Sequence, residues 1–235
     1  MATIRQIKSK KRYAIVKRNR QTKTRRGRAR KGAPITMLSL SAGFPNKILV
    51  KHKYCQNVGL TSTTGTFAST QFKCNGMFQP PASGGHQPMY FDQMTALYDH
   101  FVVIASKCKI IVSPDSASAM TKPAVVGLYV NDDTSVQYTS TTGVQEYQKG
   151  KTKLINWNAV KPISLSEYWS AKKYFGKNPL SNDNLQGSAS ADPAEMSYYT
   201  ICLQDVTTTQ TCTVDILVEI EYIAIWKELK DISQS

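Results

Sequence analysis

The segment "CTVDILVEIEYIAIW", residues 212–226, carries the strongest secondary-structure signal in this chain of 235 residues. Apolar side chains occupy every second position, and most of the positions between them are polar or charged. The residues that share the apolar face are Val214, Ile216, Val218, Ile220, Tyr222, Ala224 and Trp226. Because successive side chains of a β-strand point to opposite faces, this pattern predicts one long strand with one buried face and one wet face.

Six further runs predict strands by the same criterion. They are "KILVKHKY" (47–54), "TQFKCNGMF" (70–78), "HFVVIASKCKIIVS" (100–113), "AVVGLYV" (124–130), "TKLINW" (152–157) and "YYTICLQ" (198–204). Stretches rich in Thr, Ser and Gly at 61–66, 139–143, 187–192 and 207–211 are predicted to be loops. At least seven strands with long polar connections favour an all-β fold, a single jelly-roll β-sandwich with Greek-key connections.

Only two segments have a helical pattern, so we expect one or two short connector helices. Within 88–101, Pro88 suits a helix start, and apolar residues then recur at steps of three and four. These residues are Phe91, Met94, Leu97, Tyr98 and Phe101. In "SLSEYWSAKKYFG" (164–176), Ser164 and Glu167 have capping-box spacing and Gly176 suits a helix end, although a strand is an open alternative there.

Charge is segregated along the chain. Residues 1–31 contain fourteen Lys or Arg and no acidic residue, whereas residues 32–235 contain sixteen Lys and sixteen acidic residues. This asymmetry predicts a polyanionic partner. We therefore divide the chain into a basic N-terminal arm, residues 1–34, and a jelly-roll domain, residues 35–235.

The arm is predicted to be disordered and to bind nucleic acid, because its composition cannot bury enough apolar surface to fold alone. Guanidinium groups offer forked donors to phosphate oxygens, and with Tyr13 as the one aromatic residue of the arm, charge must supply most of the binding. The predicted nucleic-acid-binding residues are Arg5, Lys8, Lys10, Lys11, Arg12, Lys17, Arg18, Arg20, Lys23, Arg25, Arg26, Arg28, Arg30 and Lys31. An arm that is only solvated, or only a targeting signal, is the alternative.

Two clusters in the arm are typical of a nuclear localisation signal, "KSKKR" (8–12) and "RRGRARK" (25–31). The residues concerned are Lys8, Lys10, Lys11, Arg12, Arg25, Arg26, Arg28, Arg30 and Lys31. The N-terminal residues lack the apolar region of a secretory signal, and they are nearly free of serine, which argues against a mitochondrial presequence. No apolar run approaches the ~18 residues of a membrane span, so we expect no membrane insertion.

Signals for catalysis or metal binding are weak. The sequence has no glycine-rich phosphate loop, no GxSxG and no HExxH. The segment 83–101 contains His86, Asp92, Asp99 and His100, but their spacing forms no shell of three or four ligands. Asp132 and Asp133 fit a turn better than a cation site, and His52 lies in a lysine-rich strand without a partner that the sequence can name. We predict no catalytic residue, no metal and no cofactor.

The five cysteines are predicted to be core thiols in a reducing compartment, because their number is odd and they form no CxxC pair or Cys/His ligand spacing. They are Cys55, Cys74, Cys108, Cys202 and Cys212.

"GHQPMYFDQMTALYDHFVVIASKCKI" (85–110) resembles a segment that joins two early strands in the capsid proteins of circular, Rep-encoding single-stranded DNA viruses, the circovirus-like group. "FKCNGMFQPP" (72–81), "ISLSEYWSAKKYFG" (163–176) and "SADPAEMSYYTICLQ" (190–204) resemble further stretches of that family in the same order. One departure is Tyr90, which stands where the family has a glycine in "PMGFDQ". The loops 131–150 and 177–192 have no counterpart that we can place.

This resemblance implies an eight-stranded jelly roll of the viral coat type that self-assembles into a small icosahedral, T=1-like shell. The arm would package circular single-stranded DNA and act as a nuclear import signal, which places the protein in the virion and the host nucleus. The implied partners are the viral genome, other copies of the chain and the host nuclear import machinery; the host-cell receptor is left open. The alternatives are the coat of a small positive-strand RNA virus or satellite, and a cellular nucleic-acid-binding protein with a basic arm.

Overall fold

A computed structural model describes residues 43–114, 122–156, 161–207 and 209–231. These residues belong to one compact unit, Leu40–Ser235. The basic arm lies outside the described residues. Its predicted disorder and the boundary placed after residue 34 therefore stay predictions.

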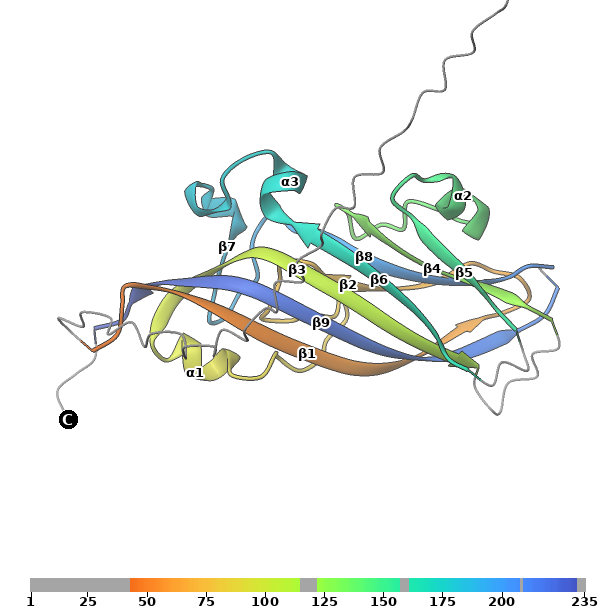
Figure 1. Cartoon of the computed structure of the whole chain (residues 1–235), viewed down its shortest axis with the longest axis horizontal. Helices are drawn as coiled ribbons and strands as arrows, with labels where there is room; N and C mark the ends of the chain where they lie inside the picture. Colours follow the sequence, from red (N-terminus) through yellow and green to blue (C-terminus); the bar gives the residue numbers. More distant parts are fainter. Residues whose placement is uncertain (1–42, 115–121, 157–160, 208, 232–235) are drawn as a thin grey trace, which may run out of the picture. The chain divides into compact units, whose positions relative to one another are not determined.

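The described residues form two antiparallel sheets that pack as a sandwich (Figure 1). The first sheet contains, in spatial order, β1 (Lys47–Ser62), β9 (Cys212–Leu229), β3 (Tyr98–Pro114) and β6 (Ile163–Ser170), with the short β7 (Gln186–Ser188) also paired to β3. The second contains β2 (Ala68–Lys73), β8 (Tyr198–Asp205), β4 (Ala124–Asn131) and β5 (Lys151–Ile155). Apart from β7, these eight strands in these orders make the two interlocked Greek keys of a jelly roll, which confirms the predicted fold class.

Strand β9 lies inside the first sheet and is paired along most of its length on both sides, with β1 and with β3. All seven residues of its predicted apolar face are at most 1% exposed. The intervening residues, among them Leu217, Glu219 and Glu221, are partly exposed. The alternation in 212–226 is therefore confirmed, and the strand continues to Leu229.

Aromatic side chains fill the end of the sandwich that receives α1 (Phe91–Thr95). The ring of Trp226 lies 5.5 Å from that of Phe91 and 5.4 Å from that of Phe101, centroid to centroid, and all three side chains are at most 1% exposed. Such tilted and edge-on contacts suit the quadrupoles of aromatic rings. This cluster ties the helix and its preceding loop to β3 and β9.

The predicted helix within 88–101 is wrong beyond Thr95, because α1 is a single turn and β3 begins at Tyr98. Tyr98 and Phe101 are 1% and 0% exposed as strand residues. From Tyr98 onward, the backbone forms hydrogen bonds with β9 across the sheet. A longer helix would lose these bonds. The apolar spacing that suggested one helical face thus spans a junction between a helix and a strand.

In the second predicted helix, the strand alternative is correct for its first half. Ser164 and Glu167 lie opposite Ile111 and Cys108 in the pairing of β6 with β3, so they form no capping box. Only Ala171–Phe175 is helical, as α3, and it ends at Gly176 as predicted. Gly176 has φ 70°, a left-handed conformation that glycine adopts without steric cost.

Several predicted loops and strand ends also differ. The stretch 139–143 leads into α2 (Thr141–Glu146), which Ser140 caps by accepting a hydrogen bond from the Gly143 N–H. Two short 3-10 turns, η1 (Pro179–Ser181) and η2 (Asp183–Leu185), precede β7, which begins the predicted loop 187–192. The strand predicted at 70–78 ends at Lys73, while β1 extends to Ser62 into a stretch predicted to be a loop.

Tyr90 has φ 68° at the N-cap of α1. Residues with a Cβ adopt this left-handed conformation at a cost, and glycine adopts it freely. This geometry is a physical reason for glycine at this position in the resembling family. The Tyr90 side chain is 66% exposed.

Four of the five cysteines are buried, as predicted, and all five are free. The prediction of a core thiol is wrong for Cys55, which lies at an outward position of β1 and is exposed. Burial raises the pKa of the Cys108 thiol, and that of Cys202 to about 12, so both stay protonated and unreactive at neutral pH.

Two isoleucines of β9 test the account of the core. Ile220→Ala empties a fully buried site and should lower the free energy of unfolding by about 3 kcal/mol. Ile223→Ala, on the wet face of the same strand, should cost less than about 1 kcal/mol. Urea unfolding followed by tryptophan fluorescence measures both. Equal losses of unfolding free energy in the two variants would contradict the assignment of Ile220 to the buried face of β9 and of Ile223 to its exposed face.

Candidate nucleic-acid interface

All fourteen predicted nucleic-acid-binding residues, including the nine of the predicted nuclear localisation signal, lie outside the described residues. The structure therefore describes only candidate contacts on the jelly-roll domain itself.

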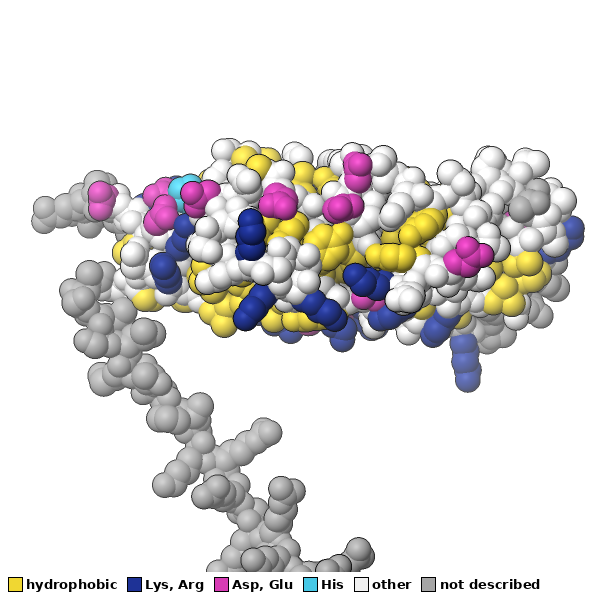
Figure 2. Space-filling model, turned by 90° about the horizontal axis from the view of Figure 1, so that it is seen from above, with side chains coloured by type: hydrophobic (Ala, Val, Ile, Leu, Met, Phe, Trp, Pro, Cys, Tyr) yellow, Lys and Arg dark blue, Asp and Glu magenta, His cyan; other side chains and the backbone are white. Residues whose placement is uncertain are grey.

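The neutral charge of residues 32–235 conceals a strong polarisation. Residues 146–177 contain seven lysines and two glutamates, a net charge of +5, which leaves the rest of this region at −5. We call these seven lysines the basic edge: Lys149, Lys151, Lys153, Lys161, Lys172, Lys173 and Lys177, and all of them are exposed. In Figure 2, lysine side chains gather toward the lower side of the view and most carboxylates toward the upper side.

The basic edge follows β5 and β6, which are edge strands of opposite sheets. The Nζ of Lys151 donates to the carbonyl oxygen of Ser166 at 2.5 Å, and the Nζ of Lys153 donates to that of Ser164 at 2.8 Å. Lys151 also pairs with Glu167 at 2.7 Å. Two lysines of β5 thus donate hydrogen bonds to carbonyl groups of the edge strand β6. These bonds link the two sheets, and they leave fewer free backbone groups with which another strand could pair.

Sequence reasoning missed the basic edge because it counted charge over the whole domain. The available signal was seven lysines within 32 residues, a local excess that only a window count reveals. Each lysine alone is an ordinary surface residue. The fold places Lys151 and Lys153 of β5 against β6, and the chain continues from β6 into α3, which carries Lys172 and Lys173.

The wet face of β1, β9 and β3 carries a second set of lysines, which acidic residues of β9 balance. Lys51 lies 2.8 Å from Glu221, while Lys53 and Lys109 lie 3.9 and 3.7 Å from Glu219. A hydrogen bond from Lys51 is the main cause of a lowered pKa at Glu221. Because cations and carboxylates alternate here, this face offers little net charge to a polyanion.

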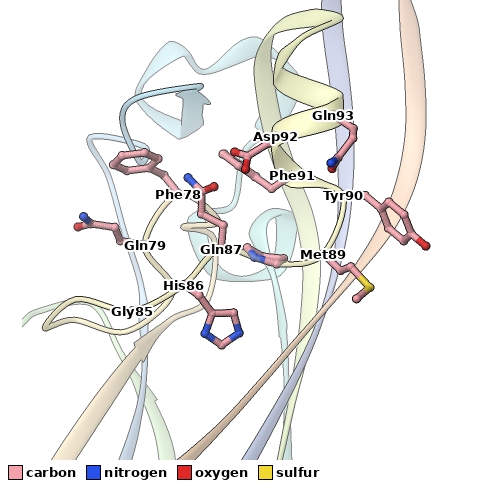
Figure 3. Close-up of a pocket in the computed structure, with 11 residues that line it drawn as sticks. Phe78, Gln79, Gly85, His86, Gln87, Met89, Tyr90, Phe91, Asp92 and Gln93 are labelled. Atoms are coloured by element: carbon pink, nitrogen blue, oxygen red, sulfur yellow. The ribbon is translucent and has the colours of Figure 1, made fainter.

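The segment 83–101 does not assemble its histidines and carboxylates into one site. His86 and Asp92 both line a hollow of about 540 Å³, but they lie at opposite ends of it (Figure 3). The His86 ring stacks on Tyr54 at 4.6 Å. His100 pairs with Glu228 at 2.7 Å and Asp99 with Lys230 at 3.7 Å. No group of three metal-ligating side chains occurs among the described residues.

Asp133 forms a turn rather than a cation site. Its Oδ1 accepts a hydrogen bond from the Ser135 N–H at 3.0 Å, and hydrogen bonding to Ser135 is the main cause of its lowered pKa. The neighbouring Asp132 is exposed.

His52 has a partner that the sequence did not reveal. It is 1% exposed, and the Nε1–H of Trp226 donates to its Nε2 at 2.9 Å, while its Nδ1 lies 3.1 Å from the carbonyl oxygen of Met89. Because an indole N–H can only donate, Nε2 must accept, and the proton of the neutral ring resides on Nδ1. Burial lowers the pKa of His52, although the bond to Met89 opposes this.

This geometry predicts an acid-sensitive contribution to stability. The folded-state pKa of His52 lies below its unfolded value of 6.5, so the contribution is complete above about pH 6.5 and is lost as the pH falls below it. The free energy of unfolding should therefore fall between pH 7.5 and 5. His52→Gln, which can still accept and donate, should reduce this fall, whereas the exposed control His86→Asn should keep it. An unchanged pH profile in His52→Gln would contradict the assignment.

No helix among the described residues is long and apolar enough to cross a membrane.

No family model and no curated protein sequence matches this chain. Among solved structures, the chain is similar to Desmodium yellow mottle tymovirus, with 21% identity, a TM-score of 0.39, and coverage of 82% of this chain and 94% of that one. It is also similar to the BFDV capsid protein as a decamer (8% identity, TM-score 0.44, 77% of this chain and 99% of that chain). The 60-mer of the same protein has 9% identity, a TM-score of 0.42, and coverage of 82% and 100%. These likenesses are distant, and the jelly-roll assignment rests on the strand order of this chain.

Proposed function

We propose that this protein is a viral capsid protein, a structural and non-enzymatic subunit that self-assembles into a closed shell around nucleic acid. The observation that carries this proposal is the union of a jelly-roll domain of zero net charge with an arm of charge +14. Jelly rolls of this type are common in viral capsids, and an acid-free arm provides a ligand for a polyanion.

The division of charge fits both tasks of a coat subunit. A neutral domain lets many copies approach one another without net repulsion. The arm meanwhile contributes fourteen positive charges per subunit. If a shell held sixty copies, their arms would neutralise on the order of 840 phosphates. A single-stranded genome of kilobase scale is a consistent cargo.

The finer parts of the proposal are that the shell is small, icosahedral and T=1-like, that its cargo is circular single-stranded DNA, and that the protein occupies the virion and the host nucleus. They are supported by the resemblance of 72–81, 85–110, 163–176 and 190–204 to circovirus-like capsid proteins. The two basic clusters at 8–12 and 25–31 support import through the host nuclear machinery.

Replacing all fourteen basic residues of the arm by Gln tests the role of the arm at constant length. Nucleic-acid retention should be lost, because binding by fourteen charges has a slope of about −10 in log affinity against log salt concentration. A control arm with the same residues in scrambled order should retain nucleic acid, since charge and not sequence provides the binding. Copurifying nucleic acid is measured by absorbance after washing at increasing salt. Retention by the Gln variant at high salt would contradict the proposal.

A further inference from the structure

We propose that the jelly-roll domain holds a second contact for single-stranded nucleic acid, separate from the arm, in a hollow on the basic edge. This inference rests on the proposed function. The hollow measures about 170 Å³ and lies where β6 continues into α3. Lys149 and Lys173 line it together with Tyr168 and Trp169.

Trp169 supplies a hydrogen-bond donor to the hollow. Its side chain is 2% exposed, and its Nε1 is buried without a hydrogen-bond partner among the described residues. Buried donors in native proteins are nearly always paired, so this N–H has room for an acceptor that a ligand or a water molecule would supply. Tyr174 and Phe175 of α3 hold the ring, at centroid distances of 6.3 and 6.0 Å, so the donor is already fixed before a ligand binds.

Two lysines supply free positive charge. Lys149 precedes β5 and Lys173 belongs to α3, and neither has an ion-pair partner in the described part of the chain. The one carboxylate of the hollow, that of Glu167, is balanced by Lys151 at 2.7 Å. The hollow therefore presents an uncompensated charge to an anionic group such as a phosphate.

Tyr168 supplies a stacking surface. It occupies an outward position of β6, and the residue is 58% exposed although its side chain is large and mostly apolar. An exposed aromatic ring beside lysines is the combination that proteins use to bind single strands, with a base on the ring and the backbone on the cations.

These groups together match an unpaired nucleotide better than they match other anions. A base in a duplex has no free face for Tyr168, and a carboxylate or sulfate would use the lysines without stacking. A base also carries carbonyl and ring-nitrogen acceptors for the indole N–H of Trp169. The occupant is therefore a single strand, with one base in the hollow and adjacent phosphates along the basic edge.

Photocrosslinking of the full-length protein tests this assignment. A single-stranded oligonucleotide that contains 5-iodouracil is bound, irradiated, and mapped by mass spectrometry of the crosslinked peptides. Crosslinks should appear at Tyr168 or Trp169 in addition to the arm. Tyr168→Ala should abolish crosslinks at position 168 and weaken those at Trp169, whereas Tyr90→Ala, which removes another exposed tyrosine, should leave both unchanged.

The salt dependence of oligonucleotide binding provides an independent readout. The double substitution Lys149→Gln and Lys173→Gln should reduce the salt slope by about 1.4, at about 0.7 per lost phosphate contact. The matched pair Lys51→Gln and Lys53→Gln, on the balanced wet face, should leave the slope unchanged. Thermal melts of both variants should match the parent, because all four side chains are exposed.

Crosslinks confined to the arm, with particles that still contain nucleic acid, would overturn the inference and leave the capsid proposal intact. A double variant that impairs shell formation at an unchanged salt slope would also overturn it, since the hollow would then be a contact between subunits. Absence of both particles and crosslinks would instead remove the proposed function itself.

Discussion

The jelly roll depends on the burial of one face of β9. This strand is paired with β1 on one side and β3 on the other, and its inward side chains from Val214 to Trp226 are covered by the second sheet. Hydrophobic burial along such a face is the main favourable contribution to folding. Its position also fixes the neighbouring elements, because Trp226 contacts the α1 cluster and donates a hydrogen bond to His52 of β1.

The same constraint determines where charge can be used. With its inner face committed to the core, the first sheet exposes the other, where Glu219 and Glu221 balance the lysines of β1 and β3. Uncompensated cations remain at the edge formed by β5, β6 and α3, and in the arm. The proposed capsid function uses this distribution. The sheet surface with balanced charge would contact other subunits, and the separate cationic segments would bind the nucleic acid.

Much of the fold could be predicted from the sequence, because alternation over many residues, as in 212–226, has one structural interpretation. Prediction failed where two elements meet within one apolar pattern, as at Tyr98, and where a spacing of three residues imitates a helix cap, as at Ser164 and Glu167. The pairing of β3 with β9 and β6 decides whether such short segments become strand or helix. The local sequence carries no information about this pairing.

The candidate sites divide in the same way. The arm is predicted from composition alone, and it stays a prediction because it lies outside the described residues. The hydrogen bond between His52 and Trp226 joins residues 174 positions apart, so it requires the fold to be known. The basic edge was hidden by an equal and opposite charge elsewhere in the domain. Conversely, the histidines and acidic residues concentrated in 83–101 suggested a catalytic or metal site. The fold separates them, because Asp99 and His100 lie in β3 and form ion pairs with other residues.

The most direct test of the capsid account is electron microscopy of the purified full-length protein, combined with nuclease typing of the nucleic acid it contains. The account predicts closed, uniform shells whose contents, once released, are digested by a nuclease specific for single-stranded DNA and resist ribonuclease. A protein that stays monomeric under every assembly condition would contradict the capsid proposal, and ribonuclease-sensitive contents would contradict its DNA cargo.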